Sequence, residues 1–307
     1  ILFEKKMVAS SVYRNIEHLV IVGTGLMATG IAQVSIASGV QVTLVGRSTD
    51  RCEMARAKIT AGINSTARRK FAGDLETQQK FAESALSKLN LSNNVFESNL
   101  AGADMVIEAI VENLKVKQKL FGELENAVSS ECILVTNTSS FLLKDVSSKL
   151  GHLAVNFAGL HFFNPVPAMK LVEVVRGDQT SDVTFNSLVA FCQRIGKTAV
   201  KCKDSAGFIV NRLLMPYLVD AIRLLEDGAA EMRDIDTAMR LGAGHPMGPF
   251  ELMDYIGLDT MKFILDGWHQ QQPDDPRFVP SEALDKLVEG GKLGRKTAEG
   301  FHRYAAK

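Results

Sequence analysis

The residues best suited to catalysis are a histidine and a glutamate, His161 and Glu173, which stand twelve positions apart. Each lies near one end of a predicted strand, and a proline-containing turn separates the two strands. Such a turn can bring the side chains face to face, so that the carboxylate holds one imidazole nitrogen, fixes the tautomer and makes the other nitrogen more basic. The pair could then exchange a proton with a substrate hydroxyl. The alternative is a core histidine with a structural partner.

A glycine-rich stretch, Gly23-Thr24-Gly25-Leu26-Met27-Ala28, fits the pattern G-x-G-x-x-G/A. It follows an apolar run at 18–23 and opens a helical pattern at 26–39. In this pattern the first glycine makes a tight turn, the second lets the backbone approach a pyrophosphate, and the small third residue lets helix and strand pack closely. The helix N-terminus offers its N–H groups to the phosphates. We therefore predict a dinucleotide site, with a ligand-free glycine turn as the alternative.

The turn after the second predicted strand (40–46) bears on the choice of dinucleotide. An acidic residue is expected there to bind the adenosine ribose. Gly46 holds that place instead, and Arg47, Ser48 and Thr49 follow. Without a carboxylate, the turn has no such acceptor for the ribose hydroxyl and no charge that would repel a 2′-phosphate. Arg47 could pair with that phosphate. The turn alone favours NADP(H), and the alternative is that Arg47 is solvated and NAD(H) is used.

Strands and helices alternate around these motifs, which indicates a parallel sheet. Further strand patterns lie at 103–111, 153–163, 170–176 and 198–204, and residues 132–140 read as a strand followed by a loop. Helical patterns lie at 112–128 and 183–196. Residues 51–90 are predicted to form a helical-hairpin insertion, and the chain turns helical after a boundary near 204. We predict an α/β fold with a Rossmann-like, mostly parallel sheet in residues 1–204 and an all-helical C-terminal domain in residues 205–307.

The composition limits the class of protein. With 307 residues, of which 46% are hydrophobic and 23% charged, the chain is long enough for two buried cores and is not disordered. Zero net charge predicts neither a nucleic-acid nor a membrane partner. The four cysteines lack metal-type or redox spacing, so we expect reduced thiols and no metal site. Segment 1–15, with Glu4, Lys5, Lys6 and Arg14, predicts neither a secretory signal nor an organelle presequence.

From about residue 18 to residue 304 the chain resembles the short-chain L-3-hydroxyacyl-CoA dehydrogenases of fatty-acid β-oxidation, in their mitochondrial form. The resemblance rests on GTGLMATGIAQ, EAIVENLKVKQ, NTSS, HFFNPVPAMKLVEV, DSAGFIVNRLL, GAGHPMGPFELMDY and GRKTAEGF. It implies reversible hydride transfer between (S)-3-hydroxyacyl-CoA and a nicotinamide cofactor, giving 3-oxoacyl-CoA. It also implies NAD(H) as cofactor, in conflict with the Gly46 turn, a homodimer formed through the C-terminal domain, and the mitochondrial matrix, with the cytoplasm as the other compartment.

The resemblance implies roles for individual residues. His161 would be the catalytic acid/base and Glu173 its orienting partner. Ser139 would bind the substrate oxygen and lie near the cofactor, although SSFLLKDV also looks like a helix start that Ser139 or Ser140 could cap. Asn211 would contact the substrate from the C-terminal domain, unless it makes an inter-helix hydrogen bond.

The remaining implied contacts concern the cofactor and the coenzyme A tail. Glu112, Lys117, Asn164 and Lys296 match cofactor positions, although Glu112 could be an ordinary helix N-terminal acid and Lys117 and Lys296 solvated charges. Arg69 aligns with a lysine that contacts coenzyme A, within a basic set formed by Arg56, Lys58, Arg68, Arg69 and Lys70. Gly62 stands where the family has a contacting serine, which weakens the expected grip on coenzyme A.

Two further hypotheses remain open. The chain could be an NADP-linked reductase of a small hydroxy acid without coenzyme A, which would not need Arg69 and Lys70. It could also be a non-catalytic, cofactor-binding or structural relative, which the presence of the whole set Ser139, His161, Glu173 and Asn211 argues against.

Overall fold

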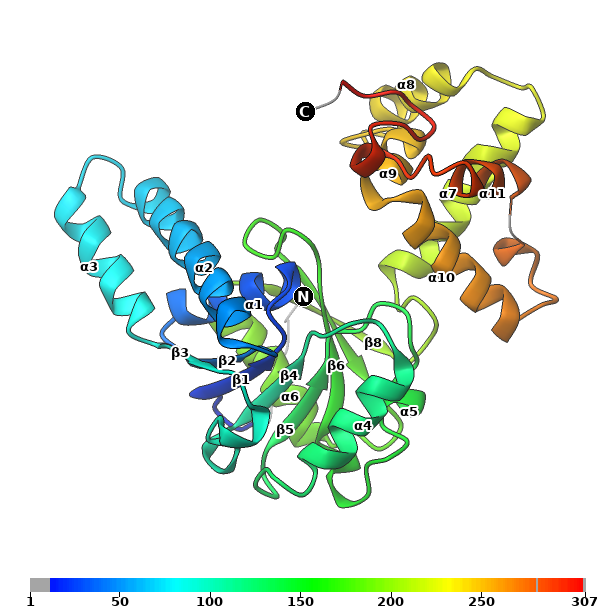
Figure 1. Ribbon diagram of the computed structural model, residues 1–307. Helices are drawn as coiled ribbons and strands as arrows, with labels where there is room; N and C mark the ends of the chain where they lie inside the picture. The colour runs from blue at the N-terminus through cyan, green and yellow to red at the C-terminus, as the bar shows by residue number, and fades with distance from the viewer. Residues whose placement is uncertain (1–11, 280, 306–307) are drawn as a thin grey trace, which may run out of the picture. The chain divides into compact units, whose positions relative to one another are not determined.

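The computed structural model describes residues 12–279 and 281–305, and the chain divides into two compact units between Phe208 and Ile209 (Figure 1). Glu4, Lys5 and Lys6 therefore lie outside the described residues. The sequence predicted this boundary near residue 204. The observed boundary lies further along the chain, because the turn at 205–208 packs with the first unit. Phe208 is 5% exposed and belongs to one of that unit's apolar clusters.

Within the described residues, the first unit is built on an eight-stranded sheet with the order β3-β2-β1-β4-β5-β6-β7-β8. The strands are β1 (His18–Val22), β2 (Gln41–Val45), β3 (Leu89–Ser92), β4 (Met105–Glu108), β5 (Ile133–Thr136), β6 (Phe157–Phe162), β7 (Leu171–Arg176) and β8 (Thr198–Lys203). Neighbouring strands are parallel except β6 and β7, which form an antiparallel pair. The predicted mostly parallel sheet is confirmed.

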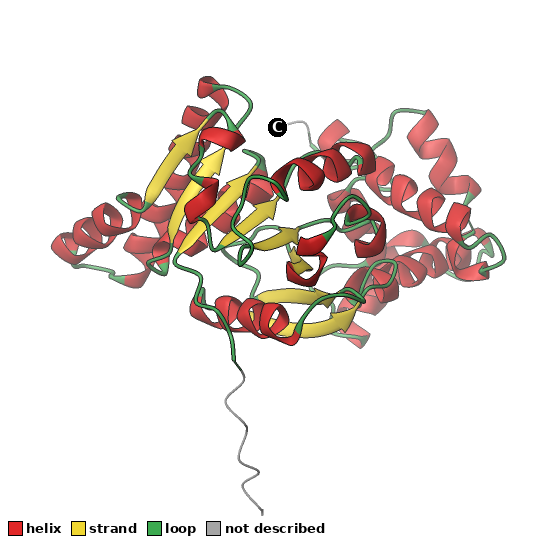
Figure 2. Cartoon of the chain, turned by 90° about the horizontal axis from the view of Figure 1, so that it is seen from below, coloured by secondary structure: helices red, strands yellow, loops and turns green. Residues whose placement is uncertain are grey.

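Helices cover both faces of this sheet (Figure 2). They are α1 (Leu26–Ala37), α2 (Thr49–Lys70), α3 (Leu75–Leu86), α4 (Leu114–Leu124), α5 (Leu143–Val146) and α6 (Asp182–Arg194), with 3₁₀ turns at Val95–Glu97, Leu100–Gly102 and His152–Asn156. One face packs against α1, α2, α3 and α6, and the other against α4 and α5. Strands buried on both faces explain the continuous apolar runs of the sequence.

The predicted helical hairpin is formed by α2 and α3, which lie side by side (Figure 1). Ser48 caps α2 by accepting the N–H of Arg51, and Asp74 caps α3 by accepting the N–H of Thr77. The expectation of helix as far as residue 90 is wrong at its end. Leu89 is 6% exposed and begins the edge strand β3, which pairs with β2.

The second unit is helical, as predicted, with isolated β-bridges only near the described end of the chain. Its helices are α7 (Val210–Glu226), α8 (Met232–Gly242), α9 (Pro249–Ile256), α10 (Leu258–Gln271) and α11 (Glu282–Glu289), with 3₁₀ turns at Pro276–Phe278 and Arg295–Thr297. Its core includes Trp268, Phe250 and Phe278, each at most 1% exposed. None of the helices described here combines the length and apolar character needed to cross a bilayer.

Candidate active site

The sheet register places His161 directly opposite Glu173 in the antiparallel β6–β7 pair. Side chains opposite each other on one face of such a pair lie within contact distance. Nδ1 of His161 lies 2.7 Å from Oε2 of Glu173, and the two side chains are 7% and 0% exposed. With the carboxylate as acceptor, the proton sits on Nδ1 and Nε2 is left as the basic nitrogen. This geometry is compatible with a proton-transfer pair.

The surroundings of His161 hold its ring in place. The rings of Phe163 and Phe208 lie with centroids 4.5 and 5.5 Å from the imidazole. Asn137 accepts the N–H of Phe162 at 3.0 Å, which ties the loop after β5 to the strand that carries the histidine. Asn137 lies inside the NTSS motif, but no sequence pattern indicates that its side chain reaches β6.

A buried lysine forms hydrogen bonds with the turn between β6 and β7. Lys197, at 8% exposure, donates through Nζ to the carbonyl of Met169 at 2.6 Å and to that of Val166. Burial lowers the pKa of Lys197 below its ordinary value. The turn contains a cis peptide bond between Asn164 and Pro165, and Asn164 is exposed on it. Lys197 is a supporting residue that the sequence patterns did not reveal.

Ser139 lies in the loop that follows β5, at the carboxyl edge of the sheet and partly exposed. Its hydroxyl lies 3.5 Å from that of Ser140. The alternative that either serine caps a helix is wrong, because α5 begins only at Leu143. The N–H groups of Leu143 and Lys144 instead donate to the carboxylate of Asp204, at 2.9 and 3.1 Å. The Ser139 hydroxyl is therefore available to a ligand.

The glycine loop has the geometry that a pyrophosphate needs. Gly23 has φ of +134°, and a Cβ there would collide with the carbonyl of Ala109. Gly25 precedes α1 with open space around its Cα, and no side chain caps the helix. The first N–H groups of α1 are therefore left uncapped, and the open space beside Gly25 lets a phosphate approach them closely. Ala28 is fully buried against the core, as its predicted packing role requires.

Neighbouring side chains crowd the turn at Gly46. A Cβ at Gly46 would lie 2.6 Å from Sγ of Cys52 and 2.9 Å from Cγ2 of Thr24. Cys52 is itself fixed, because its thiol donates to the carbonyl of Ser92 at 3.2 Å. Arg47 is exposed and, in the described part of the chain, makes no ion pair or hydrogen bond. The space that a carboxylate stem would use is filled by neighbouring side chains.

A cluster of charged groups lies at the ends of β4 and β5. Lys117 is 1% exposed, and its Nζ lies 2.6 Å from Oε1 of Glu108 and 3.0 Å from Oε2 of Glu112. Thr136 donates to Glu108 at 2.8 Å, and Thr138 donates to Glu112. The alternative that Lys117 is a surface lysine is wrong. Glu108, fully buried, is a residue that the sequence analysis did not single out.

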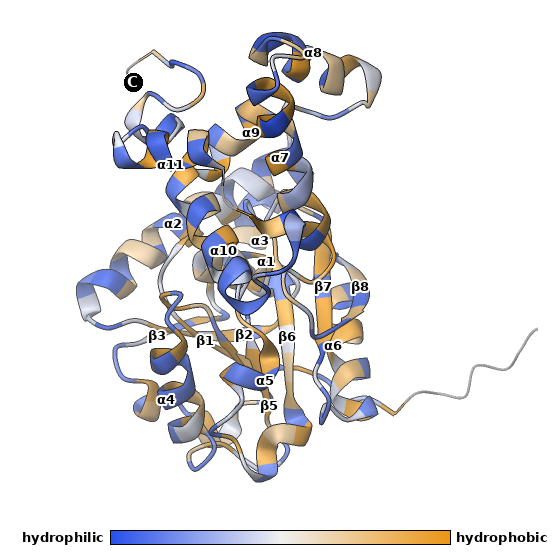
Figure 3. Cartoon of the chain, turned by 90° about the vertical axis from the view of Figure 1, so that its right-hand side faces the viewer, coloured by the Kyte–Doolittle hydropathy of each residue, from blue (hydrophilic) through white to orange (hydrophobic). Residues whose placement is uncertain are grey.

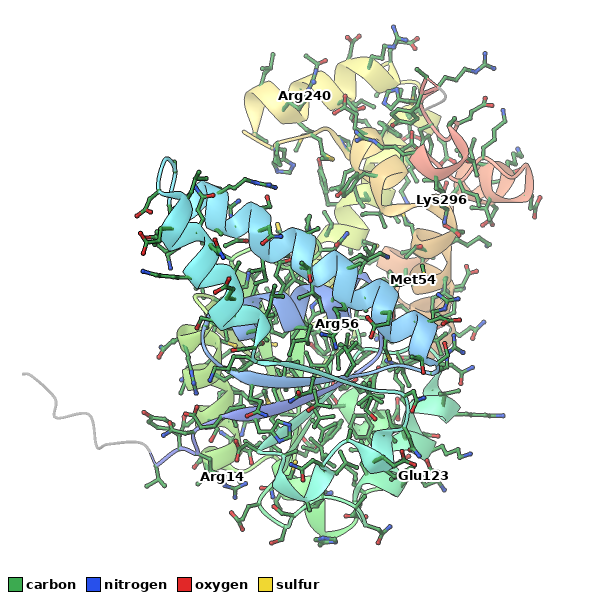
Figure 4. All side chains as sticks on the ribbon, turned by 60° about the vertical axis from the view of Figure 1, so that its left-hand side comes forward. Arg14, Met54, Arg56, Glu123, Arg240 and Lys296 are labelled. Carbon is green, nitrogen blue, oxygen red and sulfur yellow. The ribbon has the colours of Figure 1, made fainter. Side chains whose placement is uncertain are left out.

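The hairpin helix α2 presents basic side chains to solvent. Arg56, labelled in Figure 4, pairs with Glu53 at 3.3 Å, whereas Arg69 is exposed and makes no ion pair among the described residues. Lys70 lies 5.3 Å from the ring centroids of Phe71 and Phe81. The hairpin therefore keeps at least one unpaired cation for an anionic ligand.

The site of the missing serine on α2 is occupied from the neighbouring helix. A Cβ at Gly62 would collide with the side-chain amide of Gln33 on α1. Nε2 of Gln33 donates a hydrogen bond to the hydroxyl of Thr66 on α2, at 3.3 Å. Gln33 also lines a small cavity of about 150 Å³ together with Lys58 and Asn164. The amide of Gln33 is thus a polar group near the position where the family has a serine hydroxyl.

Two predicted site residues belong to the second unit. Asn211 lies in the first turn of α7 and is partly exposed. Lys296 is exposed and pairs with Asp259 within the same unit. It is labelled in Figure 4. Both side chains of this pair are almost half exposed, at 45% and 42%, so the role of Lys296 stays a prediction.

The first unit matches the model of the NAD-binding domain of 3-hydroxyacyl-CoA dehydrogenase over residues 18–205. The second matches the C-terminal domain of the same enzyme over residues 207–304. This chain belongs to the 3-hydroxyacyl-CoA dehydrogenase family. Members of the family are oxidoreductases, and both of its domains are present here in their usual order.

Relatives and solved structures of this family cover nearly all of the chain. It is 52% identical to a probable 3-hydroxyacyl-CoA dehydrogenase of Caenorhabditis elegans, over 94% of this chain and 93% of the relative. It is 49% identical to the mitochondrial hydroxyacyl-coenzyme A dehydrogenase of Homo sapiens, over 94% and 91%. The crystal structure of (S)-3-hydroxybutyryl-CoA dehydrogenase from Ralstonia eutropha is 34% identical, covers 95% of this chain and 100% of that one, and gives a TM-score of 0.89.

Proposed function

We propose that this protein interconverts (S)-3-hydroxyacyl-CoA and 3-oxoacyl-CoA, with NAD(H) as the redox partner, in fatty-acid β-oxidation. The observation that carries the proposal is the buried His161–Glu173 pair, with its 2.7 Å contact, in a chain that matches both domains of the family. The first unit would bind the cofactor, and the second would contribute to the substrate cleft and to dimerisation.

The proposed mechanism assigns one task to each residue. A nicotinamide cofactor would supply the hydride-transfer chemistry at C3 of the substrate, and the loop from Gly23 to Ala28 would hold it. Nε2 of His161 takes the proton of the C3 hydroxyl, while Nδ1–H stays bonded to Glu173, whose carboxylate stabilises the imidazolium. The Ser139 hydroxyl donates to the substrate oxygen and holds it near Nε2. In the reverse direction the imidazolium returns the proton to the 3-oxo oxygen.

Several cofactor contacts follow from the same proposal. The loop from Gly23 to Ala28 would hold the pyrophosphate. Glu112, Lys117 and Asn164 would contact the nicotinamide half, and Lys296 would contribute from the second unit. Asn211 would contact the substrate. These assignments rest on the match to the family's motifs together with the uncapped N-terminus of α1.

The exposed, unpaired Arg47 favours a second candidate for the cofactor, NADP(H). Its guanidinium could pair with a 2′-phosphate that no carboxylate repels. The assay that decides is oxidation of NADH and of NADPH by acetoacetyl-CoA, run side by side. A much higher kcat/KM with NADH would contradict a role for Arg47 in NADP(H) binding. No turnover with either cofactor would contradict the proposed function as a whole.

Because Cys52 and Thr24 fill the space beside Gly46, a single Gly46→Asp substitution is expected to distort the turn. We expect the combined variant Gly46→Asp, Thr24→Gly and Cys52→Ala to restore the ribose contact and shift preference toward NAD(H). The control is the double variant Thr24→Gly and Cys52→Ala, which makes the space without supplying the acid. The quantity to compare is the kcat/KM with NADH divided by the kcat/KM with NADPH. An equal value in the triple and double variants would contradict the steric explanation.

The coenzyme A tail is proposed to lie along the α2–α3 hairpin, with Arg69 and Lys70 on its phosphates and Gln33 beside Gly62. Replacing Arg69 and Lys70 by alanine should raise the KM for acetoacetyl-CoA and leave kcat nearly unchanged. The control is Lys119→Ala, which removes a lysine that is 77% exposed on α4, a helix on the other face of the sheet from the hairpin. An unchanged KM would favour the alternative reductase, which acts on a small hydroxy acid without coenzyme A.

We also propose a homodimer formed through the second unit. Large apolar side chains on α8, α7 and α10 are exposed, with Leu241 at 83%, Leu213 at 70% and Phe263 at 54%. Figure 3 shows hydrophobic (orange) and hydrophilic (blue) residues side by side along the helices of the second unit. A second copy of the chain would cover the exposed apolar side chains. Leu213→Glu with Leu241→Glu should give a monomer in sedimentation analysis. The control Leu75→Glu changes an equally exposed leucine in the first unit, at 79%, and should leave the mass unchanged.

The mitochondrial matrix is the proposed compartment, because mammalian relatives about half identical to this chain are named as mitochondrial proteins. Cell fractionation, with detection of the protein in the mitochondrial matrix, tests this. Retention of the protein in the cytoplasmic fraction would contradict it.

A further inference from the structure

The charged cluster at Glu108, Lys117 and Glu112 carries a surplus of negative charge. Two carboxylates meet one ammonium, at 2.6 and 3.0 Å, so the formal charge of the cluster is −1. The other partners of Glu108 are neutral: the hydroxyl of Thr136 and the N–H of Ile110, each at 2.8 Å. Glu108 is 0% exposed, Lys117 1% and Glu112 30%, so solvent screens the Glu108–Lys117 part of the cluster weakly and reaches Glu112 only in part.

The position of the cluster in the sheet relates it to one half of the cofactor. The strand order reverses between β1 and β4, and the two halves of a dinucleotide bind on either side of such a switch point, outside the carboxyl ends of the strands. The glycine loop follows β1. Glu108 ends β4, and His161, which must reach the reacting carbon, lies near the end of β6. The cluster is therefore on the nicotinamide side.

We propose that Glu108 is a positioning residue for Lys117 and that the Glu108–Lys117–Glu112 cluster strengthens the binding of NAD⁺ relative to NADH. The inference rests on the proposed function. The nicotinamide ring is cationic in NAD⁺ and neutral in NADH, so a fixed negative charge stabilises only the oxidised form. Glu108 sets this charge without touching the cofactor itself: it holds the ammonium of Lys117, which in turn holds Glu112.

Glu108→Gln tests the inference, because the amide keeps the size of the side chain and brings the cluster to zero charge. We expect the dissociation constant of NAD⁺ to rise about tenfold, the order of one unit of charge in a partly buried site, while that of NADH changes less than about twofold. NADH is titrated by its fluorescence, and NAD⁺ by calorimetry. Neither measurement requires turnover.

Two matched variants separate charge from structure. Thr136→Val removes the neutral hydrogen bond to Glu108 but leaves the charge, so it should leave the NAD⁺/NADH ratio unchanged. Glu125→Gln removes another structural carboxylate of the same unit, which accepts the N–H groups of Gly151 and Leu153. It should also leave the ratio unchanged. If Glu108→Gln does not fold, Glu112→Gln removes the same charge from a side chain that is 30% exposed and should shift the ratio alike.

Equal weakening of both cofactor forms by the Glu108 and Glu112 variants would overturn the inference and leave Glu108 a purely structural role. An unchanged ratio would overturn it as well. The proposed function is tested separately by wild-type turnover of acetoacetyl-CoA with NADH. Turnover in the wild type together with an unchanged ratio in the variants would reject this inference alone.

Discussion

Two basic side chains at the carboxyl edge of the sheet are held by carboxylates in different ways. His161 meets one carboxylate, Glu173, across an antiparallel strand pair at 2.7 Å. Lys117 meets two, Glu108 and Glu112, at 2.6 and 3.0 Å. An imidazole with one carboxylate keeps a second nitrogen that can take and return a proton. One ammonium between two carboxylates has no free lone pair to offer a substrate proton, and the formal charges of the three groups sum to −1. The first arrangement suits chemistry, and the second suits a fixed electrostatic field.

His161→Gln should break the chemical half of this comparison. The amide cannot act as a general base, so we expect kcat to fall about 10³- to 10⁴-fold with the NADH dissociation constant nearly unchanged. Stopped-flow or steady-state oxidation of NADH by acetoacetyl-CoA measures the loss. His152→Gln is the control, because His152 is 65% exposed in the same unit. Normal turnover in His161→Gln would refute the proposed mechanism.

Lys117→Met should disrupt the second arrangement, the Glu108–Lys117–Glu112 cluster. Removing the ammonium leaves Glu108 as a buried carboxylate without its ionic partner, which costs about 3–5 kcal/mol of unfolding free energy. Thermal or urea unfolding measures this cost. Lys119→Met, on the same helix, removes a lysine that is 77% exposed and only loosely paired with Glu123, so it should change the stability by less than about 0.5 kcal/mol. Similar stabilities of the two variants would contradict the importance of the buried cluster.

Glu173→Gln sharpens the distinction between orienting a base and supplying one. The amide can still accept a hydrogen bond, but it cannot compensate the charge of the imidazolium, so we expect kcat to fall about 10²-fold. Because Glu173 is proposed to act through His161, the double variant Glu173→Gln with His161→Gln should be no slower than His161→Gln alone. Additive losses in the double variant would assign Glu173 an independent role.

The sequence predicted the first of the two arrangements and missed the second, for a physical reason. His161 and Glu173 flank one short connection, and the period of two in paired strands puts them on one face. Glu108 lies inside ADMVIEAIV, which reads as an ordinary buried strand. Its partner Lys117 comes from the next helix, and no periodicity relates a strand residue to a helix residue beyond a loop. The resemblance to the family pointed to Lys117 as a cofactor position, but it did not indicate that the side chain is buried.

The same limit explains the smaller errors in the fold. The alternating β/α order and the helical second unit follow from local apolar periodicity. The start of α5 does not, because its cap is Asp204, which lies 61 positions from Leu143. The crowding beside Gly46 likewise comes from Cys52 and Thr24, which the fold brings next to it. Long-range contacts of this kind leave no local pattern in the chain.

A third buried cation completes the comparison and gives the smallest expected effect. Lys197 is held by the carbonyls of Val166 and Met169 and not by a carboxylate, and burial lowers its pKa from the ordinary value of 10.5. Between the lowered pKa and 10.5 the unfolded chain binds more protons than the folded one. The unfolding free energy contributed by this group must therefore rise with pH across that window.

Lys197→Met removes the titration, so the stability of the wild type relative to this variant should increase as the pH rises through the alkaline window below 10.5. Urea unfolding of both proteins at a series of pH values measures the difference, and other alkaline transitions cancel in it. A difference that stays flat would mean that the two carbonyls compensate the charge fully. Carbonyl dipoles would then serve a buried cation as well as the carboxylates around Lys117 do.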